Sequence, residues 1–356
     1  MNNLEAVRAH LVQFSVGVAA SSHFVGSLLQ LFSTDPAFGH LIAITGDLNG
    51  VYEHPTLVLP GIRLAGALNF LALNGEEEEL RRVIPPAQMA VNEATRAAVL
   101  DVLSRRRQDL WRLTRTAPQT NEVGRSAMLF AGLCNLGADR PVRLLELGSS
   151  GGLNLLCDTY AFPQIAHYNV GKSAVSIGFE WQGTAPDTSN WKPPPIISRK
   201  GCDLNPLDLK GDDFIRSLSY IWPDQLHRVA LFRAAVEHFC RNSEPVSIVR
   251  ESAELFLERE LQNPGATVVM HSIMLQYPPV EVRRKIEGTI REAGKRATPE
   301  APLHWLRFEL EGLLSPGADS SNYLLDLITF VGDKEEGHRR ILAEAHPHGL
   351  LMKWKL

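Results

Sequence analysis

The sequence predicts an α/β protein in which a mostly parallel sheet follows a helical N-terminal region. Residues 1 to about 137 show apolar spacing of helical period with cap and stop signals, and no convincing strand pattern. From residue 142 onward, short apolar runs alternate with helical patterns, which is typical of strand–helix units. A chain of 356 residues also exceeds the usual size of one core. We therefore expect a helical N-terminal cap over residues 1–118 and an α/β domain over residues 119–356.

The helices of the N-terminal region are predicted from their boundaries. Asp35 followed by Pro36 is a typical helix start, and Gly75 and Gly137 are typical helix stops. The double proline Pro85-Pro86 separates two helical patterns. We expect helices over residues 61–75, 87–115 and 120–137.

The strands of the sheet are predicted from short apolar runs bounded by turn residues. They are expected at residues 142–147, 195–199, 246–250, 266–271, 303–309 and 323–331, with 349–354 as an edge strand. Helices fit between them at residues 150–160, 223–241, 252–262 and 280–293. The segment 161–195 is rich in Trp, Gly and Pro and does not fit the alternation. We expect it to leave the sheet and to shape either an acceptor pocket or an interface.

Composition excludes several classes of function. A net charge of −4 and a pI near 6.3 argue against nucleic-acid binding, and the basic run Arg105–Arg107 is interpreted as a solvated helix face. No apolar run is long enough for a membrane span, and the four scattered cysteines suit a reducing compartment. His346 and His348 lack a third ligand, so no metal site is expected. We expect a cytoplasmic protein that acts on a small molecule, and a homodimer is compatible with the sequence.

The stretch ELGSSGG, residues 146–152, supports two interpretations. Its G-x-S-x-G spacing fits the strand–helix turn that presents a serine nucleophile, here Ser150, in hydrolases. Acids and histidines follow in the order that a hydrolase needs, at Asp203, Asp224, Asp326, His338, His346 and His348. However, the helical character of the preceding residues leaves no room for the strands that normally precede such a turn.

The second interpretation is a turn that binds a nucleotide-like cofactor. Gly148 permits a tight turn, and the small residues Ser150 and Gly152 let the backbone approach a ligand. Glu146 at the strand end is costly to bury unless a ligand or turn amides bind it. Asn154, in the helix that follows, is expected beside the same ligand. The pattern resembles motif I of Rossmann-like S-adenosylmethionine-dependent methyltransferases, with Ser150 in place of the middle glycine.

Two further acids fit this cofactor interpretation. Asp203 follows the second strand, where an acid would hold the ribose hydroxyls, provided that residues 161–195 are an insertion. Glu251 follows the third strand, where methyltransferases often carry an acid beside the adenine. A plain helix N-terminus at Glu251 and Ser252 explains the same residues equally well.

The acceptor side is predicted at the end of the fourth strand. His271 could act there as a general base towards a hydroxyl or carboxyl-type acceptor, and Tyr277 follows it. A histidine hydrogen-bonded within the sheet is the alternative. Asn121 and Arg125 lie at the entry to the helix before the first strand, from which Arg125 could clamp a carboxylate. The alternative for this stretch is a helix cap with an internal Glu–Arg pair.

Several motifs together resemble one bacterial family, the domain-of-unknown-function family 2332. They are QTNEVGR, LLELGSSGGLNL, GCDLNPLD, SYIWPDQ, HSIMLQY and HPHG, in this order along nearly the whole chain. The resemblance implies a helical N-terminal part joined to a Rossmann-like, methyltransferase-type domain, but no particular reaction. We expect methyl transfer from S-adenosylmethionine to a small molecule, with S-adenosylhomocysteine as product. The alternatives are a non-catalytic ligand-binding or interaction module and a serine hydrolase.

Overall fold

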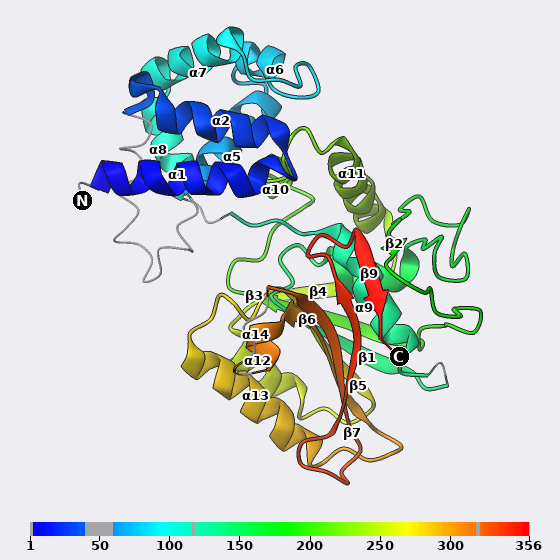
Figure 1. The fold of residues 1–356 in the computed structure, drawn as a ribbon. Coiled ribbons are helices and arrows are strands. Elements are labelled where there is room, and N and C mark those ends of the chain that lie inside the picture. Colours follow the sequence, from blue (N-terminus) through cyan, green and yellow to red (C-terminus); the bar gives the residue numbers. More distant parts are fainter. Residues whose placement is uncertain are drawn as a thin grey trace. The chain divides into compact units, whose positions relative to one another are not determined.

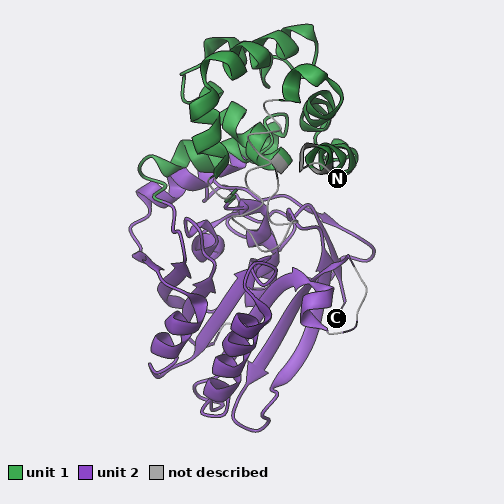
Figure 2. Cartoon of the chain, turned by 90° about the vertical axis from the view of Figure 1, so that its left-hand side faces the viewer, with its two compact units in different colours: residues 1–120, 208–230 green, residues 121–207, 231–356 purple. Residues whose placement is uncertain are grey.

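The computed structural model of the protein describes residues 3–39, 60–115, 118–137, 139–315, 317 and 321–355. The chain divides into two compact units, which Figure 2 shows in different colours. Unit 1 comprises residues 1–120 and 208–230, and unit 2 comprises residues 121–207 and 231–356. The segment 208–230 therefore clusters with the N-terminal helices, whereas the sequence pattern assigned it to the α/β domain. No helix among the described residues is long and apolar enough to cross a membrane.

Unit 1 is helical. Its elements are α1 (Asn3–Ala19), α2 (His23–Thr34), η1 (Pro36–Phe38), α5 (Pro60–Leu73), α6 (Glu78–Val83), α7 (Glu93–Arg105), α8 (Arg107–Arg115) and α10 (Asp213–Ser219). Side-chain caps begin several of them: the Ser22 hydroxyl accepts from the Val25 N–H, and Asp35 caps η1 as the sequence predicts. The α2, α5 and α7 helices contribute buried apolar side chains to one shared core.

The helix predicted over residues 87–115 is divided into α7 and α8. Asn92 and Thr95 form a capping box, which starts α7 several residues later than predicted. Arg106 leaves the helical conformation and separates the two helices. The basic run is also not simply a solvated face, because Arg105 forms an ion pair with buried Glu77 at 2.8 Å and Arg106 pairs with Glu76.

Unit 2 is built on one sheet of nine strands, all of them at or after Val142 in the described part of the chain (Figure 1). The strands are β1 (Val142–Leu147), β2 (Glu180–Trp181), β3 (Ile196–Asp203), β4 (Val246–Arg250), β5 (Thr267–Ser272), β6 (Leu303–Leu310), β7 (Tyr323–Phe330), β8 (His338–Ala345) and β9 (Leu351–Trp354). Their order in the sheet is β2-β9-β8-β7-β6-β5-β1-β3-β4. The predicted α/β fold with a largely parallel sheet is confirmed.

The sheet has a parallel part and an antiparallel part. Strands β4, β3, β1, β5 and β6 run parallel to one another. The pairs β6–β7, β7–β8 and β8–β9 are antiparallel, and the edge strand β2 is parallel to β9. The sequence pattern missed β8, because the strand begins with the exposed residues His338, Arg339 and Arg340 instead of an apolar run. The prediction that 349–354 is an edge strand is wrong, since β2 pairs outside β9.

Helices cover both faces of the sheet. On one face, α12 (Ala253–Glu260) and α13 (Val280–Gly294) bury apolar side chains against Leu145, Leu147 and Trp305. On the other face lie α9 (Ser126–Cys134) and the 3-10 helix η4 (Leu153–Thr159), which replaces the helix predicted over residues 150–160. The alternation of side chains along β1 places Glu146 on this second face. The helix α11 (Leu226–Arg241) contributes residues to both units.

The segment 161–195 lies outside the sheet over most of its length, but it returns to the sheet at β2, so the prediction that it leaves the sheet holds only in part. Aromatic contacts anchor it at two places. Phe162 stacks on Phe130 of α9, with 4.3 Å between ring centroids. Trp191 packs against Trp354 of β9, with centroids 4.6 Å apart, and β2 pairs with the same strand. These contacts give the segment an ordered path over unit 2. Its predicted part in an acceptor pocket or an interface stays a prediction.

Candidate functional site

The turn after β1 is a tight, partly left-handed segment at the carboxyl end of the parallel strands. Gly148 and Gly152 have φ values of +66° and +77°, which favour glycine. A Cβ at residue 152 would also lie 2.6 Å from Cδ1 of Ile248. Ser150 adopts φ +53° without being a glycine, so it occupies a conformation that glycine adopts at lower cost. The sequence expectation that Ser150 takes the place of a glycine agrees with this geometry.

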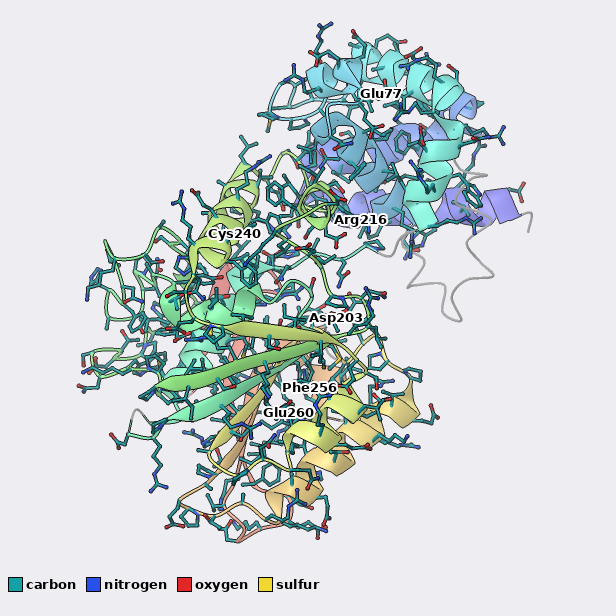
Figure 3. The ribbon with its side chains drawn as sticks, turned by 180° about the vertical axis from the view of Figure 1, so that it is seen from behind. Glu77, Asp203, Arg216, Cys240, Phe256 and Glu260 are labelled. Carbon is teal, nitrogen blue, oxygen red and sulfur yellow. The ribbon has the colours of Figure 1, made fainter. Side chains whose placement is uncertain are left out.

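Asp203 lies at the end of β3, where Figure 3 labels it, and its carboxylate holds this turn in place. The backbone N–H of Ser150 donates to Asp203 Oδ2 at 2.9 Å, and the N–H of Asn205 donates to Oδ1 at 2.8 Å. The backbone N–H of Glu251 donates to the Asp203 carbonyl at 3.1 Å. The Glu251 side chain forms an ion pair with Arg259 at 2.5 Å. Asp203 and Glu251 therefore lie at neighbouring strand ends, as predicted, and both take part in protein contacts.

Asn121 covers the turn from the segment before α9. When its amide oxygen faces the turn, it accepts hydrogen bonds from the N–H groups of Gly151 and Gly152, at 2.9 and 3.1 Å. This orientation gives both N–H groups an amide oxygen as acceptor, and the Gly152 N–H also donates to the Ser149 carbonyl at 2.7 Å. The structure thus brings Asn121 to the predicted cofactor turn from the helix entry on which the sequence placed it.

Glu146 is buried beneath the turn, with only 2% of its surface exposed. Its carboxyl group hydrogen-bonds to Asn154, whose Oδ1 accepts from the Ser126 hydroxyl at 2.6 Å. Burial raises the pKa of Glu146 well above its ordinary value, and the charge of Asp203 raises it further, against the Asn154 hydrogen bond. Glu146 Oε2 and Ser150 Oγ are both buried and have no hydrogen-bond partner within the described part of the chain. Two buried polar atoms at one turn therefore lack the partners that such atoms normally have.

His271 is fully buried in the sheet, with 0% exposure. The Trp305 indole N–H donates to its Nε2 at 3.0 Å, so the proton lies on Nδ1, which donates to Glu309 Oε1 at 2.6 Å. Both ring nitrogens are thus engaged inside the protein. This arrangement favours the structural alternative for His271 and does not support the predicted role as a base.

Glu309 organises the loop that follows β5. Its Oε1 also accepts from the N–H groups of Met274, at 2.8 Å, and Leu275, at 3.3 Å. Ile273, just before them, has φ +52°, a strained conformation for a β-branched residue. Tyr277 lies further along this loop and is 55% exposed. The sequence analysis missed Glu309, although an acid inside the apolar run of residues 303–309 was a usable signal.

Arg125 and Glu122 lie beside the same loop and beside the C-terminal HPHG motif. The Arg125 guanidinium donates to the carbonyls of Pro347, at 2.9 Å, and Ser272, at 3.3 Å. Glu122 Oε2 contacts His348 Nδ1 at 2.8 Å. The internal Glu–Arg pair that the sequence offered as an alternative is therefore not formed among the described residues. The Glu122–His348 contact spans most of the chain, so no local pattern indicated it.

The contacts that a serine nucleophile needs are missing around Ser150 among the described residues. No described histidine hydrogen-bonds to Ser150 Oγ, as a serine nucleophile would require. His338 contacts Asp333 at 2.8 Å instead. Within the described ranges, no group of three or more metal-ligating side chains is arranged to hold a metal ion.

Comparison with known proteins identifies one relationship. A family model described as "Uncharacterized protein conserved in bacteria (DUF2332)" matches residues 8–354. No curated protein and no solved structure matches the chain.

Proposed function

The chain belongs to the family DUF2332 of conserved bacterial proteins, and we propose that it binds S-adenosylmethionine and transfers the methyl group to a small molecule. The observation that carries this proposal is the pair of buried, unpartnered oxygens at the turn after β1, Glu146 Oε2 and Ser150 Oγ. A polar ligand would supply the missing partners and so remove the cost of burying them.

The topology supports this location for a ligand. Numbered in chain order, the five parallel strands run 3-2-1-4-5 across the sheet, which is the Rossmann order. Open sheets of this kind bind ligands outside the carboxyl ends of the strands, where the strand order reverses. Here the reversal falls between β1 and β5, and the turn that contains Gly148 and Ser150 follows β1 directly.

The chemistry of the surrounding residues fits an adenosine-type cofactor with an amino-acid end. Asp203 would hold the ribose hydroxyls from the end of β3, where its carboxylate also accepts the backbone hydrogen bonds of the turn. Glu251 lies next to Asp203, at the end of the neighbouring strand, where the adenine would lie. Asn121, Gly148, Gly152 and Asn154 shape and cover the turn, and Glu146 would meet the polar amino-acid end.

The reaction requires mainly alignment in a closed site. S-adenosylmethionine supplies, when bound, a methyl group activated by a sulfonium sulfur. The nucleophilic atom of the acceptor would form a bond to the methyl carbon, and the electron pair of the broken S–C bond would stay on sulfur. The acceptor would lie beside Tyr277, on the exposed loop after β5.

Isothermal titration calorimetry with S-adenosylmethionine and S-adenosylhomocysteine tests the proposal. We expect the wild type to bind both, and Glu146→Gln or Ser150→Ala to weaken binding about tenfold, the effect of one lost hydrogen bond to a polar ligand. Glu258→Gln is the matched control, because Glu258 is exposed on α12. Absence of binding to the wild type would exclude the proposed function.

Two further measurements separate the alternatives. Tritium transfer from methyl-labelled S-adenosylmethionine to a bacterial small-molecule extract reports turnover. Cofactor binding without any transfer would favour a non-catalytic binding module. Labelling of Ser150 by a fluorophosphonate probe, absent in Ser150→Ala, would favour a serine hydrolase instead.

A further inference from the structure

Arg125 is a partly buried cation that forms no ion pair with an acid in the described part of the chain. Its guanidinium donates only to the carbonyls of Pro347 and Ser272, and no described acidic side chain forms an ion pair with it. Glu122 and Glu309 act on it electrostatically, but Glu122 Oε2 contacts His348 and Glu309 Oε1 contacts His271. Glu309 Oε2 has no hydrogen-bond partner among the described residues. Burial lowers the pKa of Arg125. Arg125 is partly buried, and a partly buried guanidinium without an ion pair favours an anionic ligand.

Two tyrosines, Tyr277 and Tyr323, lie within electrostatic range of this guanidinium. Tyr277 follows the loop that Glu309 binds, and its N–H donates to the Met274 carbonyl at 3.1 Å. Tyr323 pairs across β6 and β7 with Leu310, the residue after Glu309. Both tyrosines interact electrostatically with Arg125, and neither hydroxyl hydrogen-bonds to another described residue. The guanidinium and the two phenol groups therefore belong to elements that meet around the loop after β5, and Tyr277 on that loop is exposed.

The backbone at this place is strained, which is an independent observation. Ile273 has φ +52° and lies between Ser272, whose carbonyl accepts from Arg125, and Met274, whose N–H donates to Glu309. A β-branched residue adopts this conformation only when its surroundings enforce it. Such outliers concentrate at ligand-binding and catalytic sites.

We infer that Arg125, Tyr277 and Tyr323 form a binding site for a carboxylate beside the proposed cofactor turn. This inference rests on the proposed function, because both sources of the carboxylate belong to the proposed reaction. One is the amino-acid end of the cofactor, and the other is the acceptor, which would then be a small carboxylic acid. In both cases the guanidinium and the phenol hydroxyls donate to the carboxylate oxygens.

Three ligands distinguish these sources in calorimetric titrations of the wild type and Arg125→Gln. They are S-adenosylhomocysteine, 5′-methylthioadenosine, which lacks the amino-acid end, and benzoate added to protein saturated with S-adenosylhomocysteine. We expect either S-adenosylhomocysteine or benzoate to bind about 10- to 100-fold more weakly to Arg125→Gln than to the wild type. The affinity for 5′-methylthioadenosine should stay unchanged. A selective loss of S-adenosylhomocysteine assigns the carboxylate to the cofactor, and a selective loss of benzoate assigns it to the acceptor.

The inference is overturned if Arg125→Gln lowers the affinities for S-adenosylhomocysteine and methylthioadenosine equally. It is also overturned if the affinity for neither carboxylate ligand changes in this variant. Tyr323→Phe is expected to weaken the same carboxylate about tenfold, and it keeps the test valid if Arg125→Gln does not fold. Arg112→Gln is the matched control, because the Arg112 side chain is 75% exposed in unit 1. Benzoate binding that depends on Arg125, in a protein that binds no S-adenosylhomocysteine, would remove the proposed cofactor and keep the carboxylate site.

Discussion

Two buried glutamates lie on opposite faces of the same sheet and differ in how completely the protein satisfies them. Glu260, at the end of α12, is 3% exposed, and Glu146, on β1, is 2% exposed. Glu260 is surrounded by cations, whereas Glu146 keeps one oxygen without a partner in the described part of the chain. Burial alone therefore does not distinguish a structural carboxyl group from a ligand-binding one.

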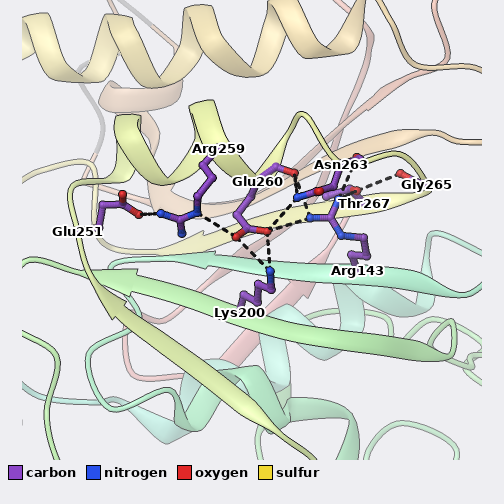
Figure 4. Close-up of polar contacts among 8 residues, drawn as sticks. All are labelled: Arg143, Lys200, Glu251, Arg259, Glu260, Asn263, Gly265 and Thr267. Atoms are coloured by element: carbon purple, nitrogen blue, oxygen red, sulfur yellow. Dashed lines mark hydrogen bonds and ion pairs between the residues drawn. The ribbon is translucent and has the colours of Figure 1, made fainter.

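Figure 4 shows how Glu260 ties three elements together. Arg143 of β1 contacts its carboxylate at 3.1 Å, Lys200 of β3 at 3.0 Å and Arg259 at 3.3 Å. Asn263 adds a hydrogen bond to the Glu260 carbonyl. Burial opposes ionisation of Glu260, but the hydrogen bonds and charges of Lys200 and Arg259 outweigh it and lower its pKa. These contacts fix α12 on the sheet and give both carboxylate oxygens of Glu260 partners within the protein, so no ligand is needed there.

Glu146 shows the reverse arrangement. Asn154 provides its hydrogen bond, burial raises its pKa, and its second oxygen lies at the turn where the strand order reverses. The comparison teaches that the partners of a buried acid, rather than its burial, indicate its purpose. A saturated acid stabilises the fold, and an unsaturated one is a candidate to bind a ligand.

The largest expected change in stability comes from Glu260, the acid whose oxygens all have partners. Glu260→Gln removes the negative charge and leaves Arg143 and Lys200 without their acid, so we expect a loss of about 3 kcal/mol in unfolding free energy. Urea unfolding measures this loss. Glu258→Gln, on the exposed face of α12, is the control and should change stability by less than about 0.5 kcal/mol. Equal losses in both variants would contradict a structural role for the Glu260 network.

A second substitution strains the backbone of the turn after β1, above Glu146. Gly152→Ala forces an L side chain to φ +77° and brings its Cβ against Ile248, so we expect a loss of about 2 kcal/mol. Gly288 lies within α13 with nothing within 4 Å of an added Cβ. Gly288→Ala is therefore the control and should gain about 0.5 to 1 kcal/mol in thermal or urea unfolding. A harmless Gly152→Ala would show that the turn is looser than its geometry indicates.

The two acids should also give pH dependences of opposite sign. Above the ordinary glutamate pKa of 4.5, the unfolded chain loses the Glu146 proton that the folded chain keeps, so stability falls as the pH rises. Replacement by Gln removes this effect, and Glu146→Gln should gain stability over the wild type from pH 4.5 towards neutral pH. Below its ordinary pKa, Glu260 stays ionised only in the folded chain, so its contribution is complete above that pKa and declines as the pH falls.

Thermal unfolding of the two Gln variants and the wild type, across acidic and neutral pH, measures both trends. The deficit of Glu260→Gln should shrink in acid, while the advantage of Glu146→Gln should vanish there. Parallel curves for the two variants would remove the distinction between the two acids.

The smallest expected effect comes from Ser150→Gly, which restores the residue that the motif usually carries. Glycine relieves the left-handed conformation at φ +53°, but it also increases the entropy of the unfolded chain, so we expect a gain of at most about 1 kcal/mol. Affinity for S-adenosylhomocysteine should fall, because the Ser150 hydroxyl is one of the proposed ligand contacts. Unchanged affinity would leave Glu146 as the principal contact at this turn.

The sequence by itself determined the elements whose signal is local. The strand over residues 142–147, the turn that follows it and the strand over residues 246–250 lie where the apolar runs and glycines predict them. The α/β fold class follows from the same alternation. Glu146 could be singled out because an acid at the end of an apolar strand conflicts with the pattern around it.

The tertiary structure alone decided which of the predicted side chains remain available. The structural alternative for His271 is favoured because Trp305 and Glu309, more than thirty residues away in sequence, engage both of its nitrogens. Contacts of long sequence separation likewise joined Asn121 to the turn and left Arg125 with carbonyl partners. Whether a donor or acceptor atom already has a partner depends on which residues meet in space. The residue types and spacings within one stretch of sequence do not contain that information.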